Sequence, residues 1–124
     1  MIEQGSTASI TYTTDERSTA IVLGSGDLPV LATPKVVALV EEAAVAAVAG
    51  FVADTDTTVG SHIEVDHLAP TPIGGTVVAT ATVVAIKGRR LDFEATVTEG
   101  ELLVAKATHV RYIVDRKRFM NSIA

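Results

Sequence analysis

Hydrophobic and polar positions follow two different periods along this chain, and the change between them separates a helical part from a sheet-forming part. From Pro34 to Val52 apolar residues occupy nearly every side of a helical pattern, which is typical of a helix covered by other structure. From Ile63 onward apolar and polar residues alternate, as they do in strands with one buried face. The pattern therefore predicts one long helix followed by a sheet.

Cap and turn residues place the ends of these elements. Thr33 is predicted to cap the helix, because threonine is a good N-cap and Pro34 is tolerated in the first turn. Gly50 is predicted to end the helix. Strands are predicted over residues 6–14, 15–22, 76–86, 91–98 and 102–114, with a further strand through Ile63 and His67 and a basic tail at 116–118.

Consecutive strands joined by tight turns pair antiparallel. One sheet covers a helix on several sides only if it curls around that helix. We therefore expect an α+β fold, an antiparallel sheet wrapped around one long central helix, as a single domain over residues 1–124. Such a fold leaves a sheet edge and a helix flank uncovered, which predicts a homodimer.

Composition and charge exclude several classes of protein. The chain has no cysteine, which excludes disulfides and thiolate metal sites, and its three histidines lack a metal-ligand spacing. The net charge of −5 without a basic stripe argues against nucleic-acid binding. Lys35, Glu41 and Glu42 interrupt the long apolar stretch, which argues against a membrane span. The first residues lack the features of a signal peptide, so we expect a cytoplasmic protein.

Two adjacent carboxylates, Glu41 and Glu42, stand inside the apolar helix. An acidic side chain in such a place is costly unless a partner neutralises it or chemistry uses it. Both positions have apolar neighbours three and four residues away, so periodicity does not choose between them. One interpretation is catalytic; the other is a carboxylate that reaches solvent or pairs with an arginine.

The stretch from His67 to Gly74 reads H-x-A-x-T-P-x-G, and together with Thr33, Glu41 and Gly60 it resembles hotdog-fold thioesterases of the fluoroacetyl-CoA thioesterase family. In that family a threonine precedes the helix and a glutamate follows it by eight residues. The resemblance runs from about residue 31 to 119. It implies the hotdog fold and an enzyme that hydrolyses a small acyl-CoA thioester, with CoA as part of the substrate and no cofactor.

The resemblance assigns roles to the matching residues. Glu41 would be the base or nucleophile, His67 a proton shuttle or an orienting group, and Thr33 a nucleophile or a hydrogen bond to the substrate. Gly60 would offer a backbone N–H to the thioester oxygen. Each residue also has a purely structural interpretation. Glu41 would be a tolerated acid and His67 a core histidine. Thr33 would be a helix cap and Gly60 a glycine that starts a strand.

The spacing of Thr33 and Glu41 creates a geometric conflict. Eight residues of helix separate them by about 12 Å, so both cannot touch one reacting carbon. Either the helix begins later than Pro34 and Thr33 folds back, or the two residues belong to different halves of a dimeric site. We expect the first arrangement.

The remaining candidates concern the CoA phosphates and the alternative functions. Arg89 and Arg90, at a predicted hairpin turn, are expected to bind phosphate, with residues 116–118 as a second candidate, although charged turns are usually just solvated. His62 and His109 receive no role, and His109 is interpreted as structural or at the surface. A hotdog enoyl-CoA hydratase would need an aspartate followed five residues later by a histidine, and no such pair occurs. The open alternative is a non-catalytic acyl-CoA-binding module.

Overall fold

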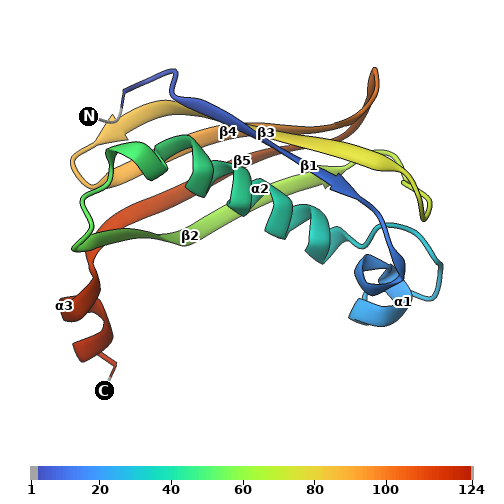
Figure 1. Cartoon of the computed structure of the whole chain (residues 1–124), viewed down its shortest axis with the longest axis horizontal. Helices are drawn as coiled ribbons and strands as arrows, with labels where there is room; N and C mark the ends of the chain where they lie inside the picture. The colour runs from blue at the N-terminus through green and yellow to red at the C-terminus, as the bar shows by residue number, and fades with distance from the viewer. Residues whose placement is uncertain (1–2, 124) are drawn as a thin grey trace.

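A five-stranded antiparallel sheet carries one long helix across its face in the computed structural model, which describes residues 3–123 (Figure 1). The α+β class and the single long helix are as predicted. Along the sheet the strands lie in the order β1-β3-β4-β5-β2. The elements are β1 (Thr7–Thr13), α2 (Thr33–Val48), β2 (Asp56–His67), β3 (Thr76–Lys87), β4 (Arg90–Glu99) and β5 (Leu102–Asp115), with the short helices η1 (Glu16–Ser18), α1 (Ala20–Leu23), η2 (Ala49–Phe51) and α3 (Arg116–Asn121).

The strands from β3 to β5 form two hairpins whose alternating pattern predicts the core. Both hairpin turns begin with a glycine in the left-handed region, Gly88 at φ +62° and Gly100 at φ +58°, a conformation in which other residues are strained. In β4, every second side chain is buried against the helix, and the solvent-facing residues between them are polar. The inward residues of β4 are Leu91, Phe93, Ala95 and Val97.

The helix α2 buries one face and leaves the other open. Its buried residues recur three and four positions apart, as a helix packed on a sheet requires. Ala38, Val45 and Ala46 are exposed on the opposite face. One chain therefore leaves a flank of the helix uncovered, as expected for this fold. The buried face consists of Val36, Leu39, Val40, Ala43, Ala44, Ala47 and Val48.

Two predicted boundaries are corrected. The N-cap of α2 is Ala32, without a side-chain hydrogen bond, so Thr33 is the first helical residue and not the cap. Residues 15–22 form helical turns and not a strand, because Asp15 accepts the backbone N–H of Arg17 and Thr19 accepts that of Val22. Such short polar side chains at helix starts compete with strand pairing.

The basic tail is also helical. Asp115 caps α3 by accepting the backbone N–H of Arg118, and α3 extends away from the end of β5 in Figure 1. No helix in the described part of the chain is long and apolar enough to cross a membrane.

The strand β2 forms one edge of the sheet and positions most of the residues discussed below. It pairs only with β5 among the described strands, and its register shifts between Gly60 and His62. The other edge is β1, which pairs with β3. An edge strand of twelve residues with a free side is a surface that a second chain can extend.

Candidate active site

The side chain of Glu41 extends from helix α2 toward the sheet, beside a buried arginine. Arg111 on β5 donates a hydrogen bond from Nη1 to Oε2 of Glu41 at 3.3 Å. The arginine side chain is 8% exposed and the glutamate side chain 42% exposed, so Glu41 is less buried in one chain than the sequence suggested. Glu42 is exposed and makes no ion pair with another described residue. The structure thus distinguishes the two adjacent carboxylates.

Gly60 lies directly against this carboxylate. A Cβ atom at position 60 would be 2.8 Å from Oε2 of Glu41 and 3.2 Å from Nη1 of Arg111. Any other side chain would displace one of these groups, so the close approach requires glycine. Two residues singled out from the sequence, Glu41 and Gly60, are therefore neighbours.

Arg111 is fixed by a network that sequence reasoning missed. Its Nε donates to Oγ1 of Thr58 and its Nη2 to the carbonyl of Thr58, both at 3.0 Å. Its Nη1 also donates to Nε2 of His109 at 3.1 Å. Nδ1 of His109 lies 2.7 Å from the carbonyl of His62, to which it donates. The guanidinium is thus held in one orientation, aimed at Glu41.

These contacts also define the charge state of His109. Because Nδ1 donates to a carbonyl and Nε2 accepts from a guanidinium, the imidazole is neutral. Burial lowers the pKa of His109 below its usual 6.5, and the charge of Arg111 lowers this pKa further. The alternation in β5, with Ala105, Ala107, His109 and Arg111 all inward, was the available signal that these two polar residues are buried.

Thr33 and His67 form a second polar group, at the start of α2. Oγ1 of Thr33 lies 2.8 Å from Nδ1 of His67. Nε2 of His67 is buried and has no hydrogen-bond partner among residues 3–123. Burial also lowers the pKa of His67 below 6.5. A buried nitrogen without a hydrogen bond lowers the stability of the fold. We therefore expect Nε2 of His67 to bond a ligand or a group of a second subunit.

A small pocket adjoins this histidine. It has a volume of about 220 Å³, and Leu68, Ala69 and Pro70 line it together with His67, Val30 and Leu31. Its walls are mostly apolar, which suits a short acyl group better than a charged one.

The predicted site residues therefore fall into two groups in one chain. Thr33 and His67 are together, and Glu41 and Gly60 are together. Eight helical residues, about 12 Å of rise, separate Thr33 from Glu41. The expectation that the helix would begin later than Pro34 is wrong, because it begins at Thr33.

The predicted phosphate ligands lie at the β3–β4 hairpin. Nη1 of Arg89 donates to the carbonyl of Ile113 at 3.1 Å, and no carboxylate of the described chain pairs with it. Arg90 donates from Nε to Oδ1 of Asp92 at 2.8 Å, so its charge is already paired. Of the two, Arg89 is the one with charge left for a ligand.

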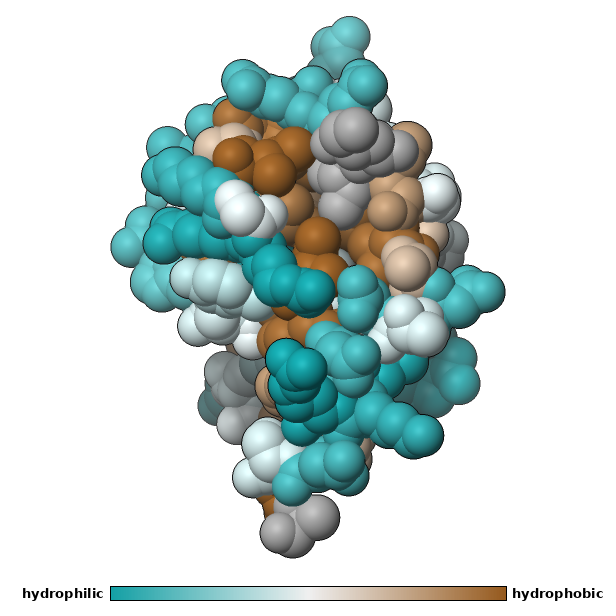
Figure 2. Space-filling view, turned by 90° about the vertical axis from the view of Figure 1, so that its left-hand side faces the viewer, coloured by the Kyte–Doolittle hydropathy of each residue, from teal (hydrophilic) through white to brown (hydrophobic). Residues whose placement is uncertain are grey.

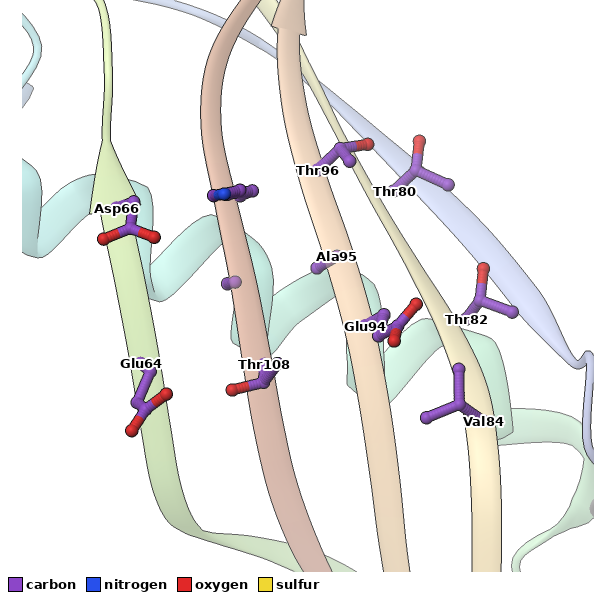
Figure 3. Close-up of a pocket in the computed structure, with 11 residues that line it drawn as sticks. Glu64, Asp66, Thr80, Thr82, Val84, Glu94, Ala95, Thr96 and Thr108 are labelled. Carbon is purple, nitrogen blue, oxygen red and sulfur yellow. The ribbon is translucent and has the colours of Figure 1, made fainter.

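A larger hollow lies elsewhere. It has a volume of about 640 Å³ and lies on the face of the sheet opposite α2, where Glu64, Asp66, Glu94 and several threonines point outward (Figure 3). Thr33, Glu41 and His67 do not line it. Of its carboxylates, Glu64 lies 3.8 Å from the exposed His62, and residues 3–123 contain no cluster of three or more metal-ligating side chains. The polar groups beside the helix are the better candidates for catalysis.

Comparisons with known proteins show which family the chain resembles. The family model described as fluoroacetyl-CoA-specific thioesterase, FlK, matches residues 14–117. A fluoroacetyl-CoA thioesterase of Streptantibioticus cattleyicolor is 34% identical over 90 residues, which span 73% of this chain and 65% of that protein. The chain thus spans less than two thirds of this curated relative.

Solved structures give the same fold. A mutant of the FlK thioesterase in complex with acetyl-CoA has a TM-score of 0.91 and 26% identity, covering 98% of this chain and 96% of that one. A hot-dog-like protein from Thermanaerovibrio acidaminovorans has a TM-score of 0.89 and 20% identity, covering 97% and 89%. The fold of this chain is the hotdog fold, as the resemblance implied.

Proposed function

The chain belongs to the FlK family of thioesterases, and from that premise we propose that it hydrolyses the thioester bond of a small acyl-CoA. The observation that carries the proposal is that Oε2 of Glu41 lies directly against Gly60, a residue of the edge strand β2. The relatives are named for fluoroacetyl-CoA, and one was solved with acetyl-CoA. A two-carbon acyl group is therefore the first substrate to test.

The proposed chemistry uses the two polar groups in sequence. The N–H of Gly60 stabilises the oxyanion as the carbonyl carbon is attacked. Glu41 either takes a proton from the attacking water or attacks directly to form an anhydride that water cleaves. The C–S bond then breaks, and CoA leaves as a thiolate that is protonated to the thiol. Thr33 and the neutral His67 bind the substrate and orient or relay the proton.

We further propose that the site is completed by a second copy of the chain. Two β2 edges pairing about a two-fold axis near Ile63 and Glu64 would bring His67 of one subunit close to the partner subunit's Gly60, since antiparallel partners have a constant sum of residue numbers apart from the register shift between Gly60 and His62. The unpaired Nε2 of His67 and the half-exposed Glu41 support this homodimer. In this homodimer, Thr33 of one subunit and Glu41 of the other would reach the same substrate, so the separation of about 12 Å within one helix is no obstacle. A CoA thioester as substrate also fits the proposed cytoplasmic location.

Release of thiol from acetyl-CoA and from longer acyl-CoAs tests the reaction. Glu41→Ala should reduce kcat by about a thousandfold, the range for loss of a general base or nucleophile. Glu42→Ala is the matched control, because it removes the neighbouring, exposed carboxylate and should leave kcat within about twofold. Tight acyl-CoA binding without turnover by the wild type would instead favour the non-catalytic binding module.

A further inference from the structure

Positive charge is concentrated at one end of this acidic protein. Six of its ten lysines and arginines lie at the β3–β4 hairpin or in α3, although the net charge is −5. The two segments lie at the same end of the molecule (Figure 1), since the N–H of Ile113 in β5 donates to the carbonyl of Arg89 at 2.9 Å and α3 follows directly after β5. Figure 2 looks onto this end, where hydrophilic side chains surround a narrow apolar strip. The six residues are Lys87, Arg89, Arg90, Arg116, Lys117 and Arg118.

Most of this charge is not neutralised within the chain. Lys87 and Arg90 share the carboxylate of Asp92. The other four cations make no ion pair with any residue from 3 to 123. Arg89 and Arg116 are instead anchored by carbonyls, those of Ile113 and Asp54, which fix the guanidinium and leave its charge for a ligand. The unpaired cations form what we call the basic end: Arg89, Arg116, Lys117 and Arg118.

The basic end lies at the distance from the candidate site that CoA requires. The N–H of Arg116 donates to the carbonyl of Thr55, at the start of β2. Five residues of strand separate Thr55 from Gly60, about 16 Å. The pantetheine arm of CoA has about twelve chain atoms between its sulfur and the first phosphorus, as many as four residues of backbone, so it spans about 14 Å when extended.

Exposed aromatic side chains accompany the cations. Phe51, Tyr112 and Phe119 are 48%, 37% and 39% exposed, and they account for three of the five aromatic residues of the chain. Phe51 ends η2, just before the Asp54–Thr55 turn that holds Arg116. Aromatic faces beside cations suit a ligand that combines a purine ring with phosphates.

We propose that the basic end binds the adenosine 3′-phosphate 5′-diphosphate part of CoA. Its phosphates would contact Arg89, Arg116, Lys117 and Arg118. The proposal rests on the proposed thioesterase function for its substrate, and its geometry is independent of which residue is the base. It assigns no phosphate to Arg90, whose guanidinium is held by Asp92.

The test compares a substrate that has the phosphates with one that lacks them. In the full chain, Lys117→Ala/Arg118→Ala removes two cations that make no side-chain hydrogen bond to a described residue, so the fold should be kept. KM for acetyl-CoA should rise about tenfold with kcat within twofold, and KM for acetyl-pantetheine should not change. Arg17→Ala/Lys106→Ala is the matched control, since it removes the same charge away from the basic end and should leave both KM values unchanged.

Direct binding separates this proposal from the reaction itself. Calorimetric titration with adenosine 3′,5′-bisphosphate should show binding to the wild type and the control, weakened about tenfold in Lys117→Ala/Arg118→Ala and by added salt. That result would support the basic end even if no thioester were hydrolysed. Equal binding by both double variants, or equal KM shifts for the two thioesters, would overturn it while leaving a thioesterase in place.

Discussion

The two polar groups beside helix α2 differ in how completely the chain satisfies them. Around Arg111 every guanidinium nitrogen and both ring nitrogens of His109 have a partner, and the guanidinium alone contacts Thr58, Glu41 and His109. Around His67 a single contact, with Thr33, fixes the ring, and Nε2 has no partner in the described chain. The hydrogen bonds around Arg111 therefore make that group rigid, whereas the group around His67 still has a free hydrogen-bonding atom among residues 3–123.

This difference indicates that the Arg111 network stabilises the fold and holds Glu41 in place, whereas the His67 group keeps a free hydrogen-bonding atom. A fully bonded buried network resists change, because removal of one member leaves another uncompensated. A buried nitrogen without a partner costs stability and keeps its hydrogen bond for a ligand or a second subunit. Variants of Arg111 or His109 should therefore act mainly through stability, and variants of His67 mainly through activity.

After that of Glu41→Ala, the largest effect is expected from the group around His67. His67→Ala should lower kcat by about a hundred- to a thousandfold, because a proton relay or orienting group is lost. Tm should change by only a few degrees, since the ring makes one side-chain hydrogen bond. His62→Ala is the control, as its side chain is exposed. A large loss of Tm with unchanged kcat in His67→Ala would reverse the assignment of the two groups.

An intermediate effect on kcat is expected from a change at Gly60, where the Arg111 group would meet the substrate. Gly60→Ala places a Cβ within 2.8 Å of Oε2 of Glu41 and should push that flexible carboxylate aside. We expect kcat to fall about ten- to a hundredfold, because misplacement of a reacting group by about 1 Å has this cost. Gly50→Ala, where a Cβ would meet nothing within 4 Å, is the matched control. Equal activity of the two variants would show that the carboxylate need not lie against position 60.

The smallest expected effect is the dependence of the protein's stability on pH. The pKa values of His67 and His109 are lowered in the folded protein, chiefly by burial, so the unfolded chain binds more protons below about pH 6.5. Stability should therefore be fully present above pH 6.5 and decline as the pH falls below it. His109→Gln, whose amide can still accept from Arg111, should show a smaller decline of Tm between pH 7.5 and 5.5. A decline as steep as that of the wild type would exclude His109 as a source of the pH dependence.

Much of the fold follows from local patterns. The alternation in β4 and the glycines of its turns define the hairpins, and the helix follows from its apolar spacing. The segment 15–22 does not, because the side chains of Asp15 and Thr19 take backbone N–H groups that a strand would pair. Local sequence holds both possibilities, and the hydrogen bonds formed decide between them.

The site was predictable only in part. The family resemblance indicated Glu41 and Gly60 as candidate residues, and the structure makes them neighbours. The role of Arg111 depends on the register of β2 with β5, which sets Gly60 opposite Arg111. Such a long-range pairing cannot be read from residues 50 positions apart in the sequence.

Mixed dimers test the central claim that one site takes Thr33 and His67 from one subunit and Glu41 from the other. Glu41→Ala and His67→Ala, each inactive alone, are unfolded together and refolded at equal concentrations. Random pairing gives half mixed dimers with one intact site each, so about a quarter of the wild-type activity should return. No activity beyond that of the separate variants, in a refolded sample shown to contain mixed dimers, would contradict a shared site.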